Sequence, residues 1–449
     1  MGPSSTSLAC SAILGIALGT YDAEARDDFR QVGVAKIDIT PGYAIRLTGY
    51  AVRKSESEGV TERLWAKALA IGSDRQGPAI IITVDNCGIP LEVREEVVVH
   101  LKQGRGIAPE RVAICSSHTH SGPMVKGFAP NIFGGPLPPD EQGRVERYTH
   151  ELTEALETVA VLALENRRLG RLTRGRGQAS FAANRRTKDG PVDHDVPAMF
   201  VTDPDGLLRA VFASYACHCT TLGGDFNQIC GDWAGYAQEA IEREHPGATA
   251  LIALGCAGDA NPNPRNTLEL AKQYGQEIAT SIGAVLTNRL VPVTGKLVCR
   301  TRQIELPFDK LPTRSEWEAR AKETNYAGSH ARLNLARLDR GEKLPTKLPY
   351  MIQTWAFGNG LLMVFLPGEV VVDYSLRLKR EFDPTRLWIN AYANDVPCYI
   401  PSRRIWGEGG YEGGGAMIYY DRPTRLAEQT EEMIVSAVHG LAPRKFEAR

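Results

Sequence analysis

Short apolar runs alternate with longer stretches in which apolar residues recur at helical spacing, and this pattern begins at residue 31. Such alternation predicts an α/β fold in which helices flank mixed sheets. Strands are predicted at 79–84, 111–115, 208–217, 248–254, 297–306 and 387–391, with a hairpin at 350–357 and 361–366. Helices are predicted at 91–103, 141–167, 233–243, 268–286, 314–338, 370–382 and 423–439. The glycine-rich stretch 407–415 predicts the most flexible part of the chain interior.

The N-terminus has a different pattern. Residues 8–19 are apolar and precede a sequence typical of signal cleavage near Ala25. We therefore expect residues 1–30 to be a leader or disordered N-terminus, residues 31–449 to form one catalytic domain, and the protein to be exported to the periplasm or secreted. The leader has no lysine or arginine before its apolar run, so a cytoplasmic protein with a short helical start is the alternative. No transmembrane segment is predicted after residue 30.

The overall composition narrows the function classes. The 449 residues are 43% hydrophobic and 23% charged, which permits a sizeable core. There are 52 basic against 53 acidic residues, so charge does not indicate a nucleic-acid or anionic-membrane partner. Nine cysteines occur without a CxxC pair, which indicates neither a disulfide framework nor a zinc–thiolate site.

Two histidines lie close together where a predicted strand ends. The segment Ser117–Pro123, which contains His118 and His120, follows the strand at 111–115. On extended backbone, residues two apart point the same way, so both imidazoles are expected to face one site. Together they could hold a metal, or a metal and a substrate oxygen side by side. Ordinary hydrogen-bonded loop histidines are the alternative.

A third histidine and a carboxylate stand in similar places. His218 ends the predicted strand 208–217, and Glu369 follows Leu366-Pro367-Gly368 at the start of a predicted helix. Two histidines and one carboxylate form a ligand set that zinc hydrolases use. Each residue also has a structural explanation, because His218 could be a core histidine and Glu369 an acid stabilised by the helix dipole.

Several segments, taken in chain order, resemble the catalytic domain of neutral (non-lysosomal) ceramidases. The resemblance extends over residues 31–440 and is carried by these segments: Asp38-Ile-Thr-Pro, Leu47-Thr-Gly-Tyr-Ala, Ser117-His-Thr-His-Ser-Gly-Pro, Ala183-Asn-Arg, Ala216-Cys-His-Cys-Thr-Thr, Gly231-Asp-Trp-Ala-Gly-Tyr-Ala, Gly258-Asp-Ala-Asn-Pro-Asn, Leu366-Pro-Gly-Glu and Tyr411-Glu. It implies a mixed α/β catalytic domain and a zinc-dependent hydrolase of amide bonds that uses metal-activated water.

The same resemblance implies roles for individual residues. His118, His218, Glu369 and Tyr411 match the zinc ligands of the family. His120 matches a histidine that stabilises the oxyanion or relays a proton, and Tyr411 would share in stabilising that charge.

Three further residues match substrate contacts. Arg185 matches an arginine near the substrate carbonyl. A late family tyrosine falls on Tyr419 or Tyr420, and Tyr420 is the preferred match. Asn261 stands where the family has a serine, so a serine nucleophile is excluded there, and the Asn261 side chain is expected to bind substrate.

The substrate is expected to be a small-molecule or lipid-like acyl compound. The chain ends within about 40 residues of Tyr411, too few for the C-terminal β-sandwich domain that ceramidases carry. A metal-dependent esterase, or a deacetylase of sugar or cell-wall amides, is therefore the main alternative. A two-metal phosphoesterase using Asp85 and Asp232 ranks below it, because no GNH motif follows. A non-catalytic, metal-stabilised binding protein is the remaining alternative.

Overall fold

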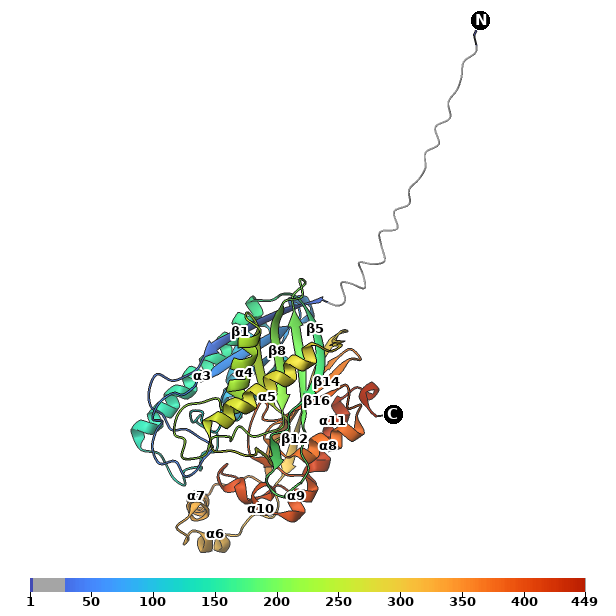
Figure 1. The fold of residues 1–449 in the computed structure, drawn as a ribbon. Coiled ribbons are helices and arrows are strands. Elements are labelled where there is room, and N and C mark those ends of the chain that lie inside the picture. Colours follow the sequence, from blue (N-terminus) through green and yellow to red (C-terminus); the bar gives the residue numbers. More distant parts are fainter. Residues whose placement is uncertain (3–28, 449) are drawn as a thin grey trace.

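The computed structural model describes residues 1–2 and 29–448, so the leader expected at residues 8–25 lies outside the described residues (Figure 1). Within the described part of the chain, no helix combines the length and the apolar character needed to cross a membrane.

A nine-stranded sheet forms the centre of the fold. Its strands follow the order β4-β3-β2-β1-β5-β7-β8-β9, and β11 pairs with β5. The pairs β3–β4 and β8–β9 at the two ends are parallel, and the others are antiparallel. The bounds are β1 Phe29–Asp38, β2 Trp65–Ile71, β3 Ala79–Val84, β4 Val112–Ser116, β5 Arg168–Gln178, β7 Asp195–Thr202, β8 Leu208–Tyr215, β9 Thr249–Leu254 and β11 Val291–Pro292.

A second sheet has the order β12-β13-β14-β16, in which only the β14–β16 pair is parallel. Its strands are β12 Leu297–Pro307, β13 Lys347–Phe357, β14 Leu361–Phe365 and β16 Leu387–Asn390. Two further pairs stand apart: β6 Ala182–Asn184 with β10 Ala260–Pro262, and β15 Glu369–Val370 with β17 Tyr399–Ile400.

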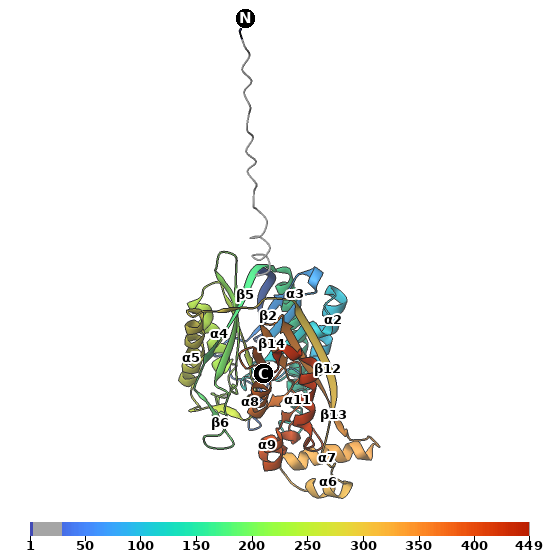
Figure 2. The same cartoon turned by 90° about the vertical axis from the view of Figure 1, so that its right-hand side faces the viewer.

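Helices cover the outer faces of both sheets, which gives four layers (Figures 1 and 2). On the larger sheet lie α2 Leu91–Arg105, α3 Pro139–Glu165, α4 Asp232–Glu244 and α5 Leu268–Leu286. On the smaller sheet lie α8 Val372–Glu381 and α11 Thr430–Leu441.

Strand alternation explains why two cores form. In β3, Ile80 and Ile82 join the core beneath the helices, whereas Ile81 joins the core between the two sheets. In that second core the rings of Phe212 and Trp388 stack with centroids 4.8 Å apart. A strand that is buried on both faces has a continuous apolar sequence, which is why the strand at 79–84 could be predicted.

The segment after β16 connects the two edges of the larger sheet. Ala391 N donates to Leu254 O at the end of β9 (3.0 Å), and Asn394 N donates to Ile114 O in β4 (2.7 Å). A further isolated bridge pairs Thr119 with Cys219. The chain that leaves β4 and the chain that leaves β8 therefore meet, although these strands are far apart in the sheet order.

Two predicted helices differ in the structure. The helix expected at 314–338 is two helices, α6 Arg314–Arg320 and α7 Tyr326–Asp339, because the Asn325 side chain accepts from Gly328 N and starts a new helix. The helix expected at 423–439 begins only at Thr430, because Leu426 forms an isolated β-bridge with Phe308 and is therefore not helical.

The glycine-rich stretch 407–415 carries regular structure. It includes the end of α9 Arg403–Glu408, all of α10 Gly410–Gly413, and the first residue of the 3₁₀ turn η3 Gly415–Ile418. The segment is therefore not a plain loop, and its flexibility stays a prediction. Gly409 and Gly410 have φ of 68° and 77°, and glycine adopts this conformation without steric cost.

Candidate metal centre and active site

His118 and His120 converge, but not through strand alternation. β4 ends at Ser116, and His118 has a φ of 56°, so the backbone here is left-handed rather than extended. The Nε2 atoms of the two imidazoles nevertheless lie 3.1 Å apart. The expected side-by-side placement is confirmed, whereas the extended geometry predicted for it was wrong. Positive φ at a non-glycine residue is strained and is concentrated at functional sites.

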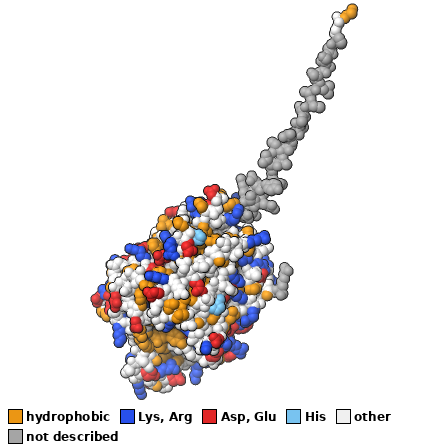
Figure 3. Space-filling view, viewed as in Figure 1, with side chains coloured by type: hydrophobic (Ala, Val, Ile, Leu, Met, Phe, Trp, Pro, Cys, Tyr) orange, Lys and Arg blue, Asp and Glu red, His pale blue; other side chains and the backbone are white. Residues whose placement is uncertain are grey.

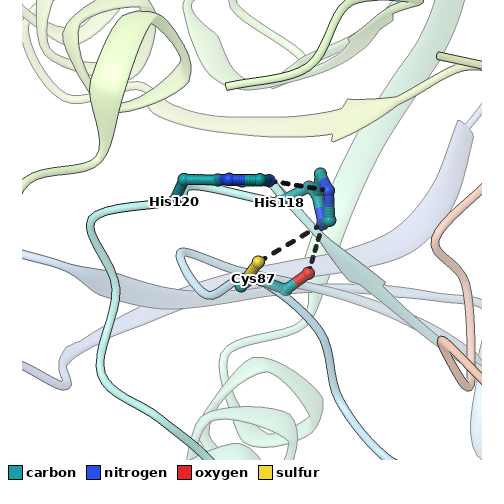
Figure 4. A group of neighbouring side chains, drawn as sticks. All are labelled: Cys87, His118 and His120. Atoms are coloured by element: carbon teal, nitrogen blue, oxygen red, sulfur yellow. Dashed lines mark hydrogen bonds between the residues drawn. The ribbon is translucent and has the colours of Figure 1, made fainter. Parts of the chain in front are cut away.

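The backbone around His118 determines which ring nitrogen is free (Figure 4). His118 Nδ1 is hydrogen-bonded to the carbonyl oxygen of Cys87, and the Cys87 Sγ lies 3.6 Å away. Because a carbonyl can only accept, Nδ1 carries the proton in the neutral ring. The Nε2 lone pair is then available to a cation.

His218 has the same arrangement. It follows β8 and is fully buried, and its Nδ1 lies 2.7 Å from the carbonyl oxygen of Ala257. The carbonyl again assigns the proton to Nδ1 and leaves Nε2 unprotonated. Both histidines therefore direct a lone pair toward the same point, where they meet Glu369.

Glu369 lies in β15, which pairs in parallel with β17, and α8 begins only at Val372. Stabilisation by the helix dipole, the structural alternative, thus does not apply. Glu369 Oε2 lies 2.9 Å from His218 Nε2 and 3.1 Å from His118 Nε2. The three ligand atoms lie within 4.8 Å of one another, and all three residues are buried. Two imidazole nitrogens and one carboxylate fit a zinc ion.

The electrostatics of this cluster favour a cation. Burial would raise the pKa of Glu369, but His118 and His218 hold it well below its ordinary value. Burial, helped by the charge of Arg185, lowers the pKa of His218 to about 4. Burial opposes a charge on His118, yet Cys87 and Glu369 raise its pKa to about 10. A metal ion at this point would replace the proton that His118 otherwise holds.

Three tyrosines surround the cluster at different depths. The hydroxyl of Tyr420 donates to Glu369 Oε1, and the hydroxyl of Tyr399 lies 3.3 Å from His218 Nε2. Tyr411 is 46% exposed, and its ring lies 5.2 Å from that of Tyr399. Tyr420 is thus in direct contact with the candidate ligand set, whereas Tyr411 lies at the cavity mouth and its role as a zinc ligand stays a prediction.

Arg185 lies beside the cluster because β6 pairs with β10. Its Nε donates to Glu412 Oε1 (2.7 Å) and its Nη2 donates to the Tyr399 hydroxyl (3.0 Å). Its Nη1 lies 3.4 Å from both His218 Nε2 and Asn261 Oδ1. The structure therefore brings Arg185 and Asn261 to the same side of the site, as expected of residues that contact one substrate.

Several residues of this site were not predicted from the sequence. Tyr399 and Glu412 hold Arg185, Cys87 orients His118, and the Tyr392 ring packs on His118 with centroids 4.4 Å apart. Glu412 belongs to the Tyr411-Glu segment that carries the family resemblance, which is the only sequence signal for it. The others act through tertiary contacts that no local pattern reveals.

The cluster opens into a cavity of about 220 Å³. Its walls are Gly49, Tyr50, Ala51, Cys87, His118, His120, Phe128, Ala129, Ile132, Glu369, Tyr399, Tyr411, Tyr419 and Tyr420. Two of the candidate ligands, His118 and Glu369, line it, and aromatic rings form much of the wall. A substrate group that enters would meet His118, His120 and Glu369 together.

Comparisons with known proteins agree with the resemblance seen in the sequence. Residues 30–268 match the family model described as "Neutral/alkaline non-lysosomal ceramidase, N-terminal". The neutral ceramidase of Drosophila pseudoobscura pseudoobscura is 24% identical over 285 residues, which are 57% of this chain and 38% of the relative. The neutral ceramidase of Pseudomonas aeruginosa is 24% identical over 497 residues, covering 92% of this chain and 72% of the relative. This chain thus spans well under two thirds of the Drosophila relative.

Solved structures show the same fold. The "Crystal Structure Analysis of neutral ceramidase from Pseudomonas aeruginosa" matches with a TM-score of 0.72 at 21% identity, over 94% of this chain and 76% of the other. The structure titled "Ceramidase complexed with C2" matches with a TM-score of 0.73 at 19% identity, over 94% and 77%. The mixed α/β fold with flanking helices is thereby confirmed.

Proposed function

Because the chain belongs to the neutral/alkaline non-lysosomal ceramidase family, we propose that it is a zinc-dependent amidohydrolase that cleaves an N-acyl bond with metal-activated water. The observation that carries the proposal is the convergence of His118 Nε2, His218 Nε2 and Glu369 Oε2 beside a cavity that His118 and Glu369 line. Three protein ligands with an open side are typical of catalytic zinc sites.

Zinc held by these residues would polarise the amide carbonyl and lower the pKa of water near the site. Burial lowers the pKa of His120 well below its ordinary value, so its imidazole is neutral at pH 7. His120 is then placed to hydrogen-bond the carbonyl oxygen or to relay a proton from water to the leaving nitrogen. Arg185 supplies a fixed positive charge, and Tyr411 a phenol, for the oxyanion that develops during attack.

Substrate contacts are proposed for Asn261 and Tyr420. Asn261 cannot act as a hydroxyl nucleophile, so its place beside Arg185 supports hydrogen bonding to the substrate and attack by water. The Tyr420 ring forms part of the cavity wall in addition to its contact with Glu369. Tyr411 as a fourth zinc ligand, the boundaries at 1–30 and 31–449, and export of the chain stay predictions.

The main alternative is a metal-dependent esterase, or a deacetylase of a polar sugar or cell-wall compound. Asn261 favours it, because an amide side chain at this position makes one flank of the site more polar than a hydroxyl would. The same catalytic groups would serve both reactions. The two proposals differ in the substrate, and an assay can therefore separate them.

The test compares hydrolysis of N-acylsphingosines with short and long acyl chains, p-nitrophenyl acetate and N-acetylglucosamine by the full chain, before and after chelation and zinc re-addition. We expect zinc-dependent release of fatty acid from N-acylsphingosine. The variant Glu369→Gln should be inactive, whereas Glu154→Gln on the exposed face of α3 should retain activity. Amide hydrolysis that survives complete zinc removal would overturn the proposal, and activity confined to the polar substrates would favour the alternative.

A further inference from the structure

The two helices α6 and α7 form an excursion between β12 and β13 of the smaller sheet, in which α7 contacts the loop beside the candidate active site and α6 packs on α7. They project from the lower end of the molecule beside α9 and α10 (Figures 1 and 2). Hydrophobic side chains gather on the surface next to this end (Figure 3). α7 also packs against η3, which leads directly to Tyr419 and Tyr420.

Tyr326, the first residue of α7, lies directly behind the cavity wall. Its hydroxyl donates to Ala51 O (2.8 Å), and its ring lies 5.5 Å from the ring of Tyr419. It packs so closely on Gly134 that a Cβ there would lie 2.8 Å from Tyr326 Cδ1. Ala51 and Tyr419 themselves line the cavity. The Tyr326 ring therefore supports the wall from outside.

A second contact holds α7 to the site. Asp421 lies 3.4 Å from His330 Nε2 and accepts from Arg337 Nη1 at 2.8 Å, and both partners come from α7. Asp421 follows Tyr420, whose hydroxyl donates to Glu369. α7 is thus fastened to the loop that carries one tyrosine of the cavity, and it cannot move away without releasing that loop.

The cavity has an apolar flank and a polar flank. Phe128, Ala129 and Ile132 line the first, and Phe128 packs edge-on against Tyr420 with centroids 5.9 Å apart. Tyr399 and Tyr411, which also line the cavity, bring polar character, and the Arg185 guanidinium lies over their rings. An acyl chain matches the apolar flank, because burying methylenes there is favourable and burying a polar head group is not.

The size of the cavity limits the acyl chain. At 220 Å³ it falls below the range of about 300–1,000 Å³ typical of sites for drug-sized ligands. A cavity of this size favours a short acyl chain over a long one.

We propose that α6 and α7 form a cap that restricts the substrate to short acyl groups, and that Tyr326 is the specificity-determining residue. The inference rests on the proposed function as an acyl hydrolase and adds the substrate class. Removing the Tyr326 ring leaves a gap between Ala51, Gly134 and Tyr419. Because Ala51 and Tyr419 line the cavity, that gap joins it and lengthens the space for the acyl chain.

The experiment uses four variants of the full chain. Tyr326→Ala removes the ring, and Tyr326→Leu removes most of it while keeping apolar packing if the alanine variant does not fold. Tyr326→Phe keeps the ring and loses only the bond to Ala51. Leu333→Ala is the control, because it shortens an apolar side chain of the same helix that is 42% exposed.

Two readouts are taken. The first is kcat/KM for N-acyl amides whose acyl chains have two to sixteen carbons. The second is binding of the free fatty acids of the same lengths, measured by calorimetry. The wild type should favour the shorter chains of this series. Tyr326→Ala or Tyr326→Leu should raise the ratio of long-chain to short-chain substrates at least about tenfold, whereas Tyr326→Phe and Leu333→Ala keep the wild-type ratio.

Each outcome decides a separate question. A wild type that favours sixteen-carbon chains, or an unchanged length profile in both ring-removing variants, overturns the cap. Absence of amide hydrolysis by zinc-loaded wild type overturns the proposed function instead. In that case the fatty-acid binding profile still tests the cap, because binding of a free fatty acid requires no hydrolysis.

Discussion

Glu369 Oε2 lies 2.9 Å from His218 Nε2, although the two residues leave different sheets. His218 follows β8 of the nine-stranded sheet, and Glu369 follows β14 of the four-stranded sheet. The candidate metal centre therefore exists only when the two sheets are packed together. Metal binding and the packing of the two layers should stabilise each other.

Removing either of these residues should abolish zinc binding. His218→Ala deletes one of three candidate ligands, and Glu369→Gln deletes the only carboxylate among them. We expect about one equivalent of zinc in the wild type and well under half an equivalent in each variant, measured by elemental analysis after zinc-supplemented expression. His100→Ala, at an exposed histidine paired with Glu157, should bind zinc as the wild type does. Full zinc content in His218→Ala contradicts the assignment.

Tyr420→Phe should weaken zinc binding about ten- to a hundredfold, because its hydroxyl is one of the groups that orient Glu369. Competition with a chromogenic chelator measures the affinity. Tyr374→Phe is the matched control, because it also removes a buried hydroxyl. That hydroxyl donates to Pro401 O (3.0 Å) and does not contact the candidate zinc ligands. Equal affinities in Tyr420→Phe and the wild type would show that the contact with Glu369 does not orient it.

Asn261→Ala should keep measurable activity. Asn261 Oδ1 accepts weakly from Arg185 and Thr220, at 3.4 Å each, so its loss should lower kcat/KM roughly ten- to a hundredfold. Loss of a covalent nucleophile instead costs about 10⁴-fold or more. Asn288→Ala, at an exposed residue just after α5, should have wild-type kinetics. A 10⁴-fold loss in Asn261→Ala, or an acyl adduct seen by mass spectrometry, would refute attack by water.

The ionised Asp421 should stabilise the fold at neutral pH, and this stabilisation should be lost in acid. Burial opposes its ionisation, but hydrogen bonds from Arg337 and His330 lower its pKa from 3.8 to about 2. The folded pKa lies below the unfolded one, so the stabilisation is complete above about pH 4 and is lost as the pH falls through 2. A pKa shift of this size adds about 2 kcal/mol to the free energy of unfolding at pH 7.

Asp421→Asn tests this contribution without straining the backbone, because asparagine tolerates the positive φ of 55° at this position. Urea unfolding at pH 7 should show a loss of about 2 kcal/mol relative to the wild type, and the difference should shrink by pH 3. Asp205→Asn on an exposed turn is the control. A difference that is the same at pH 7 and pH 3 would exclude the ion pair as its cause.

Elements with a strong local pattern could be predicted from the sequence. The strand at 79–84 and the helix at 268–286 have the same bounds in the structure, because a continuous apolar run and a clear helical stripe determine them. The start of α11 could not be predicted, since Leu426 forms a bridge with Phe308, far away in the sequence. The pairing order of the strands depends on such distant contacts throughout.

The candidate site was predictable only in part. His118, His218 and Glu369 were recognised because each lies in a motif that follows an apolar run, and the structure brings them together. Tyr399 carries no such signal, yet its hydroxyl contacts both Arg185 and His218. Its importance comes from β15 pairing with β17, a contact between short strands that local propensity does not indicate.

The segment 391–394 is hydrogen-bonded to the ends of both β4 and β9. Fraying at either edge of the larger sheet must first break these bonds, so partial unfolding should not separate His118 from His218 while leaving the rest intact. The amide hydrogens of Ala391 and Asn394 should therefore exchange with solvent only through global opening of the molecule. The catalytic geometry would then be lost in one step with the tertiary structure, and a thermally stressed sample would contain intact and unfolded molecules with few damaged intermediates.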